Sequence, residues 1–239
     1  MPNDWFQFRH FMIRQDRSAM KVGTDGVLLG AWAGCEECLS VLDVGTGTGL
    51  MALMIAQRNQ GAIITALEID PGAASQASEN VRASLWPDRI EVIRSDFRDW
   101  EPESGRRFDL IICNPPFFTR ALKNPDNQRA TARHDDELPL AGLIVKSAGM
   151  LSGNGKLALI LPAGRVSEAK AGAMDGGLFV YRQLNIRGKF QTPVKRVLLE
   201  WGREERVAEL EELVIETDTR GVYTEAYKVL TGEFYLGNS

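Results

Sequence analysis

A polar turn that could hold an amine follows one apolar stretch of the chain. Residues 110–113 read Leu-Ile-Ile-Cys, which is typical of a buried strand, and Asn114, Pro115, Pro116 and Phe117 follow at once. The side-chain oxygen of Asn114 and the carbonyl oxygen of Pro115 are two acceptors for the N–H bonds of a planar amine. Proline keeps such a loop rigid, and an aromatic face can stack on a flat ring. The alternative is a turn that only ends a strand.

A glycine-rich turn follows another apolar stretch. The sequence VLDVGTGTGL at 41–50 places Asp43 near the end of a strand and Gly45, Gly47 and Gly49 before a helical pattern. Glycine allows a ligand to approach the backbone closely, and ligands of open parallel sheets bind at the carboxyl ends of the strands. We therefore expect a nucleotide-type ligand here, although a tight turn without a ligand is the alternative. The third glycine comes one residue too early for the dinucleotide fingerprint.

Strand-like and helix-like stretches alternate around these two turns, which predicts a parallel sheet with helices on both faces. Residues 178–187 and 194–202 are joined by too few residues for a helix, so we expect an antiparallel pair at one edge, with 213–217 as a further candidate strand. We expect a single domain over 1–239, in which a lead-in of 1–40 precedes a Rossmann-like core of 41–239. The other expected strands are 41–44, 63–69, 89–94, 108–113 and 156–162, and the expected helices are 49–58, 71–85, 138–151 and 164–174.

The glycine turn and the acid before it resemble the first motif of the class I S-adenosyl-L-methionine (SAM)-dependent methyltransferases. The resemblance implies SAM as cofactor and a seven-stranded, mostly parallel sheet with an antiparallel edge. It implies that Asp43 and the three glycines lie at the cofactor and that Glu68 binds the ribose hydroxyl groups. Asp96 would bind the adenine amine, and Phe97 would lie beside the adenine ring.

Asp70 is a weaker candidate for the ribose contact than Glu68. It directly precedes Pro71, so it can cap the helix that begins there.

The run IICNPPF resembles the motif of amino methyltransferases, which methylate a planar nitrogen. The resemblance implies that Asn114, Pro115, Pro116 and Phe117 form the catalytic site, with Asn114 also at the cofactor. An amine conjugated to a ring has a delocalised lone pair and is a poor nucleophile. Two acceptors that hold its N–H bonds turn that lone pair toward the methyl group, so the chemistry requires positioning rather than a strong base.

Both ends of the chain resemble the bacterial tRNA methyltransferases that modify the N6 amine of adenosine 37 in a valine tRNA. An aromatic start leads into MKVGTDGVLLGAW, and the blocks at 132–140 and 222–236 resemble the same family. The resemblance implies a tRNA anticodon loop as partner, and Lys21, Thr24 and Asp25 near the cofactor, with Lys21 among its contacts. Thr24 or Asp25 could instead cap a helix, and the aromatic start could simply pack on the sheet.

Two other acceptors remain as alternatives to adenine. The same motif occurs in enzymes that methylate guanine N2 in ribosomal RNA or a glutamine amide in a translation factor. The glutamine enzymes usually carry an extra helical domain before the glycine turn and tyrosine after the prolines, which this chain lacks. A nicotinamide-dependent Rossmann protein and a non-catalytic RNA-binding module that retains the fold are rivals of other classes.

The charge distribution argues both for and against a nucleic-acid partner. The net charge is −4, but residues 200–220 hold eight acids and three bases (−5), which leaves the rest of the chain at about +1. The acidic stretch at 204–216 fits RNA binding poorly, whereas 176–199 contains no acid. If the basic residues of that segment and of the lead-in flanked one site, they would favour a polyanion; otherwise they are ordinary surface. The basic residues are Arg9, Arg14, Arg17, Lys21, Arg182, Arg187, Lys189, Lys195 and Arg196.

The composition indicates a cytoplasmic protein without a membrane span or a metal site. Three cysteines, an odd number, indicate a reducing compartment, and the N-terminus does not resemble a secretory signal. Cys35 and Cys38 lack a second pair, and the chain has two histidines, so four zinc ligands are not expected. We expect a monomer.

Overall fold

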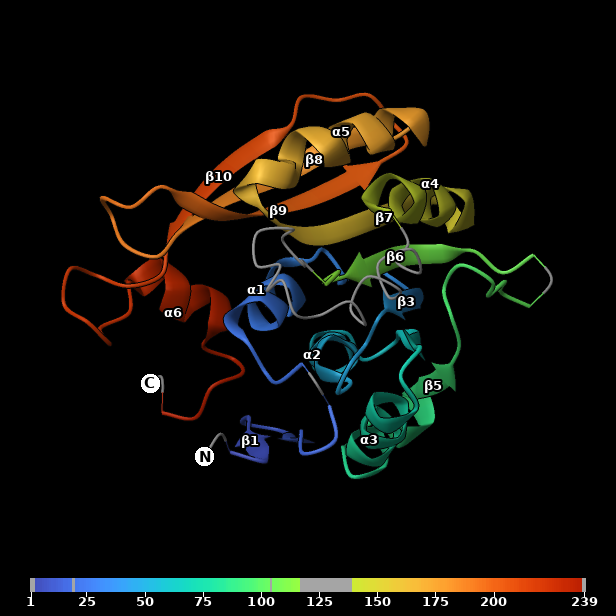
Figure 1. Cartoon of the computed structure of the whole chain (residues 1–239), viewed down its shortest axis with the longest axis horizontal. Coiled ribbons are helices and arrows are strands. Elements are labelled where there is room, and N and C mark those ends of the chain that lie inside the picture. Colours follow the sequence, from blue (N-terminus) through green and yellow to red (C-terminus); the bar gives the residue numbers. More distant parts are fainter. Residues whose placement is uncertain (1–2, 19, 104, 117–138, 238–239) are drawn as a thin grey trace, which may run out of the picture.

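The computed structural model describes residues 3–18, 20–103, 105–116 and 139–237. Over these ranges the main sheet has eight strands in the order β10-β8-β9-β7-β6-β3-β4-β5, and the five strands from β7 to β5 run parallel (Figure 1). The α/β class, the parallel core and the antiparallel pairing of 178–187 with 194–202 are confirmed. The antiparallel strand β9 lies inside the sheet, because β8 and β10 follow it toward the edge. The strands are β3 (Ser40–Val44), β4 (Ile63–Glu68), β5 (Ile90–Arg94), β6 (Phe108–Cys113), β7 (Leu151–Pro162), β8 (Phe179–Arg187), β9 (Val194–Gly202) and β10 (Glu209–Val214).

The expectation of seven strands is wrong by one. The additional strand, β10, pairs parallel to β8 and begins at Glu209, four residues before the candidate strand at 213–217. The first residues of β10 are mostly glutamate, which has low β propensity, so the sequence does not predict a strand there. Pairing explains these acids: Glu211 lies 3.3 Å from Arg182, and Glu212 lies 3.8 Å from Arg187. The acidic stretch therefore neutralises part of the basic segment at the edge of the sheet.

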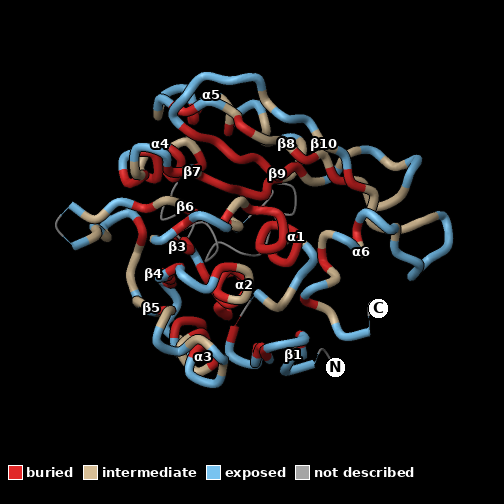
Figure 2. Tube along the Cα trace, turned by 180° about the vertical axis from the view of Figure 1, so that it is seen from behind, coloured by how far each residue is buried: buried red, intermediate tan, exposed pale blue. Residues whose placement is uncertain are grey.

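Helices cover both faces of the sheet, as the alternating pattern predicts (Figure 1). Successive residues of a strand point to opposite faces of the sheet. On one face they pack with α1, α2 and α6, and on the other they pack with α4 and α5. Figure 2 shows the buried positions running along the central strands between these layers. The helices are α1 (Thr24–Trp32), α2 (Leu50–Arg58), α3 (Pro71–Arg82), α4 (Leu140–Met150), α5 (Val166–Asp175) and α6 (Glu225–Thr231), with 3₁₀ turns at Pro87–Arg89 and Ala163–Arg165. No described helix is long and apolar enough to cross a membrane.

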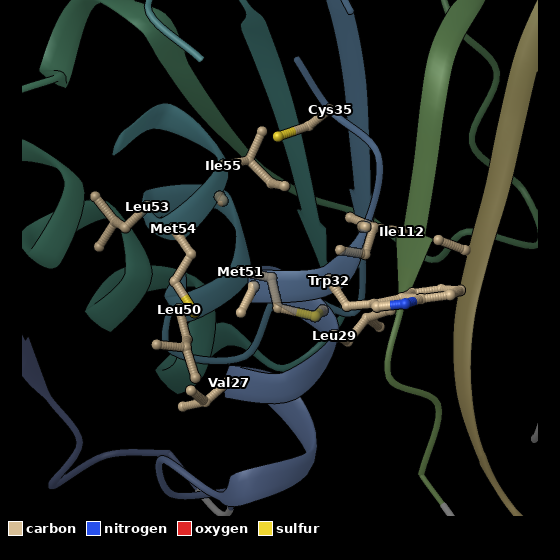
Figure 3. Packing of buried hydrophobic residues seen from close by; sticks show 14 of the residues in the cluster. Val27, Leu29, Trp32, Cys35, Leu50, Met51, Leu53, Met54, Ile55 and Ile112 are labelled. Carbon is tan, nitrogen blue, oxygen red and sulfur yellow. The ribbon is translucent and has the colours of Figure 1, made fainter. Parts of the chain in front are cut away.

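The first two helices approach closely, which places the start of the chain beside the glycine turn. Figure 3 shows side chains of α1 and α2 gathered against Ile112 of β6. A Cβ atom added at Gly30 would lie 2.7 Å from the sulfur of Met54, and one at Gly26 would lie 3.1 Å from Leu50. Glycine at these two positions therefore allows α1 to lie against α2, the helix that follows the glycine turn.

The aromatic lead-in is mostly structural. It forms a hairpin of β1 (Trp5–Gln7) and β2 (Met12–Arg14) whose turn buries Phe8 and Phe11. Phe8 stacks with Tyr235 at 5.8 Å between ring centroids, and Phe11 meets the edge of Trp86. These two rings are unavailable to a base. Trp5, with 53% of its surface exposed, is the ring of the hairpin that remains open.

Candidate active site

The strand register brings the sequence motifs to one edge of the sheet. Val44 pairs with both Cys113 and Leu67, so the residues that follow these three along the chain, Gly45, Asn114 and Glu68, lie in one row. Strands are spaced by about 4.8 Å, which puts Asn114 and Glu68 on either side of Gly45. The chain leaves β3 for β4 on one side and reaches β6 on the other, so this row lies at the topological switch point where such sheets bind ligands.

The glycine turn has the backbone that its composition predicts. Gly45, Gly47 and Gly49 have φ angles of 70°, 59° and 84°, in the region that other residues rarely adopt. Cβ atoms added at Gly45 and Gly47 would meet no atom of the described residues within 4 Å. Among the described residues, nothing therefore crowds these two positions of the turn at the switch point, as binding of a ligand requires.

Asp43 supports the turn from within the core. It is fully buried, and its Oδ2 atom accepts hydrogen bonds from the hydroxyl of Thr46 (2.6 Å) and the N–H group of Ala52 (3.2 Å). Its Oδ1 atom has no hydrogen-bond partner among the described residues. Burial raises the pKa of Asp43 to about 7, against the lowering by the two hydrogen bonds. Asp43 thus fixes the glycine turn to the start of α2.

Glu68, the last residue of β4, connects this strand to the glycine turn. Its Oε2 atom accepts from the N–H group of Gly47 at 2.8 Å, and its Oε1 atom accepts from Asp70 at 2.9 Å. A carboxylate has about four lone-pair positions, so capacity for two hydroxyl groups remains. Asp70 caps α3 through a 2.8 Å bond from Ala73, as predicted from its place before Pro71.

Asp96 and Phe97 follow β5 at the same edge. The guanidinium of Arg98 donates to Asp96 at 2.6 and 2.9 Å and, with the Arg98 backbone N–H group, lowers the pKa of that carboxyl group. The carboxylate is therefore held ionised, as an acceptor. Phe97 is 7% exposed and lies in the core beneath Lys146, whose amine is 5.5 Å from the ring centroid. Little of the Phe97 ring is open to a ligand.

The Asn-Pro-Pro turn begins where the central strand β6 ends. Asn114 and Pro115 are half-buried and Pro116 is exposed, so the polar turn borders both the core and solvent. Phe117 lies outside the described residues. The structure brings Asn114 next to the glycine turn and Glu68 through the strand register.

Lys21 of the KVGTDG block, which leads into α1, pairs with the N-terminal segment. Its ammonium lies 3.8 Å from the carboxylate of Asp4. Helix α1 begins after Gly23 without a side-chain cap, so neither Thr24 nor Asp25 caps it. Asp25 instead accepts a hydrogen bond of 2.7 Å from Arg196 at the start of β9. This pair ties the lead-in to the antiparallel edge of the sheet.

Two further residues of the site were not identified from the sequence. Ile69, in the turn between Glu68 and Asp70, is apolar yet 57% exposed, and it offers a surface for a flat ring. Asn80 of α3 is buried and binds the carbonyls of Thr48 and Arg14 and the N–H group of Arg14. An apolar residue after the acid could have indicated Ile69. Nothing in the sequence indicates Asn80, because its partners are distant along the chain.

Two other features of the described residues, a hollow and a cysteine pair, lie away from this edge of the sheet. A hollow of about 430 Å³ is lined by His10, Gln57 and Trp86 among others, where α2 ends at the opposite edge of the sheet. Among the described residues no cluster of three or more acids, histidines or cysteines could hold a metal ion. Cys35 and Cys38 are buried free thiols, and burial raises their pKa values to about 11 and about 12.

Comparisons with known proteins show which family the chain resembles. Residues 34–190 match the family model of the methyltransferase small domain. A protein of Bacteroides thetaiotaomicron is 45% identical over 237 residues, covering 99% of both chains. One of Flavobacterium johnsoniae is 43% identical over 233 residues, covering 97% of this chain and 99% of its own. Both are named tRNA1(Val) (adenine(37)-N6)-methyltransferase.

Solved structures support the fold. The crystal structure of a predicted O-methyltransferase from Agrobacterium tumefaciens superposes with a TM-score of 0.63 at 22% identity, covering 88% of this chain and 96% of that one. The methyltransferase subunit of a type I restriction-modification system from Streptococcus thermophilus gives 0.61 at 14% identity, covering 91% and 53%. The identity and coverage of the sequence relatives go further than the fold: the chain belongs to the tRNA1(Val) (adenine(37)-N6)-methyltransferase family.

Proposed function

We propose that this protein transfers a methyl group from SAM to the N6 amine of adenosine 37 in a valine tRNA, as a single domain acting in the cytoplasm. The observation that carries the proposal is the row of Gly45, Asn114 and Glu68, which puts an amine-binding turn beside a cofactor-binding turn. The relatives' name supports adenine in tRNA over guanine in ribosomal RNA or a glutamine amide.

The residues of this edge fit SAM. The open faces of Gly45 and Gly47 leave room for a ligand against the backbone, and Glu68 keeps lone pairs for the ribose hydroxyl groups. Asp96, held ionised by Arg98, accepts from the adenine amine, and the exposed Ile69 packs on the adenine ring. Asp43 acts from beneath the turn, and Gly49 permits the left-handed step into α2. When bound, SAM supplies a methyl group on a sulfonium centre.

The remaining residues orient the acceptor. The side-chain oxygen of Asn114 and the carbonyl of Pro115 hold the two N–H bonds of the adenine amine, which directs the nitrogen lone pair toward the cofactor. Pro116 has no N–H group that could bind these acceptors, and its fixed φ angle keeps the turn rigid. Phe117 stacks on the adenine ring. Orientation of this kind can lower a barrier by up to about 7–11 kcal/mol, so no general base is required.

Incubation with labelled SAM and an unmodified valine tRNA transcript tests the proposal. Nucleoside mass spectrometry should find the label in N6-methyladenosine. A matched transcript with guanosine at position 37 should remain unlabelled. Label in guanine or in protein, with none in adenine, would contradict the proposed substrate while leaving the methyltransferase assignment intact.

A further inference from the structure

An ordered turn presents an exposed aromatic ring between β8 and β9. Residues 188–193 form this turn, in which Thr192 donates its N–H group to the carbonyl of Lys189 at 3.1 Å. The Thr192 hydroxyl bonds the same carbonyl at 2.8 Å, and Arg187 donates to the carbonyl of Thr192 at 2.8 Å. Phe190 lies within this network and is 58% exposed. A rigid turn that holds a phenyl ring in water is typical of a binding surface rather than of the core.

The turn lies at the same edge of the sheet as Asn114. Cys113 pairs with Leu159 and Pro162 pairs with Arg196, so β7 and β9 extend past the end of β6. The extension beyond Cys113 runs three residues along β7, from Leu159 to Pro162, and then two residues along β9, from Arg196 back to Val194. At about 3.3 Å per residue it is about 17 Å long. The same spacings put the turn about 12 Å to the side of β6. Figure 1 shows the turn projecting beyond the strand ends.

The basic residues on the β9 side of the turn are suited to a polyanion. The acids Glu216 and Asp218 lie on its β10 side, where Glu216 donates its N–H group to the carbonyl of Gly188 at 2.9 Å. The exposed Lys195 has no ion-pair partner in the part of the chain that the structure describes, and the segment 176–199 contains no acid. Lys189 binds the backbone carbonyl of Asp218 rather than its carboxylate. The nearby Asp25 is bound by Arg196, and the acids Glu204 and Glu205 follow β9 at the opposite edge of the sheet.

We propose that the turn of residues 188–193 binds the RNA substrate outside the catalytic pocket, with Phe190 stacking on an unpaired base and Lys195 contacting a phosphate. This inference rests on the proposed function. Recognition of RNA loops relies on bases that stack on aromatic side chains, and each such stack strengthens binding without requiring a particular sequence. The distance from Asn114 means that the turn contacts a nucleotide other than the one that is methylated.

Binding of a labelled, unmodified valine tRNA transcript to single variants tests the inference. Phe190→Ala should weaken binding roughly 5- to 150-fold, and Phe190→Tyr should restore it because it retains an aromatic face. Phe179→Ala is the matched control. Phe179 is 41% exposed and is the first residue of β8, the strand that leads into the turn, so it lies at the opposite edge of the sheet. Lys195→Ala should reduce the slope of log affinity against log salt by about 0.7–0.9, whereas Lys170→Ala on α5 should not.

The outcomes separate this inference from the proposed function. If the wild-type protein methylates the transcript and Phe190→Ala binds it as tightly as wild type, the inference is wrong and the proposed function stands. If the transcript binds through Phe190 but receives no methyl group, the proposed substrate fails and the turn remains an RNA-binding surface. Equal losses in Phe190→Ala, Phe190→Tyr and Phe179→Ala would show a folding defect in the strand pair and would contradict the stacking role.

Discussion

At the scale of single residues, the site combines groups at the carboxyl edge of the sheet with groups that support them from the core. The resemblance to the class I methyltransferases implies that Asp43 lies at the cofactor, and its bonds to Thr46 and Ala52 support the turn from beneath. Glu68 faces the turn itself through Gly47. The residue types were therefore identifiable from sequence, but the division between binding and support depends on which face of each strand a side chain occupies.

The buried carboxyl group of Asp43 gives the first prediction. Its pKa is raised to about 7 in the folded protein, above the usual value of about 3.9, so the folded state holds the proton more tightly. Its contribution to stability is full below about pH 4 and is lost as the pH rises to about 7. Asp43→Asn lacks this dependence. The wild-type free energy of unfolding, relative to the variant, should therefore fall between these pH values and stay level above them.

Urea titrations of both proteins at several pH values measure this difference. A difference that is constant from pH 4 to 8, or that rises with pH, would show that Asp43 is ionised in the folded protein at low pH.

At the scale of elements, the fold fixes the site through contacts between segments that are distant along the chain. The single amide of Asn80 joins the hairpin strand β2, the helix α3 and the glycine turn by three hydrogen bonds of 2.8–2.9 Å. The Asp25–Arg196 pair does the same for α1 and β9. The lead-in is thus held against the cofactor edge from two sides.

Replacing Asn80 tests this connection. Asn80→Ala leaves the buried carbonyl of Thr48 and the N–H group of Arg14 without their partners, which should cost about 1–3 kcal/mol of unfolding free energy. Amide exchange should also accelerate in residues 12–17. Asn154→Ala, at an exposed position of β7, is the control and should change stability by less than about 0.5 kcal/mol. Unchanged exchange in the hairpin would show that other contacts hold it.

At the scale of the whole molecule, the parallel core was predictable and the additions to it were not. The stretch 108–113 forms β6 as expected, because strands buried on both faces are continuous apolar runs. The hairpin strands β1 and β2 have three residues each, and α6 has seven, too short for a periodic signal. The glutamates of β10 pair with arginines of β8. These partners lie elsewhere in the chain, so the sequence of β10 alone does not indicate the strand.

The site follows the same division. The glycine turn and the NPP turn were predicted because each is a local backbone requirement written in consecutive residues. The clamp of Arg98 on Asp96, the burial of Phe97 and the pairing of Lys21 with Asp4 depend on packing around them. The sequence indicated which residues gather at the carboxyl edge, while their orientations required the structure.

The central claim is that Asn114 orients the target amine beside the cofactor. The most direct test measures turnover on the valine tRNA transcript together with calorimetric binding of S-adenosylhomocysteine, the product form of the cofactor, for Asn114→Ala and for the control Asn154→Ala. Loss of orientation should reduce turnover of Asn114→Ala by about 100-fold or more while its cofactor binding stays within about fivefold of wild type. Wild-type turnover in Asn114→Ala, or a loss of cofactor binding as large as the loss of turnover, would contradict the account.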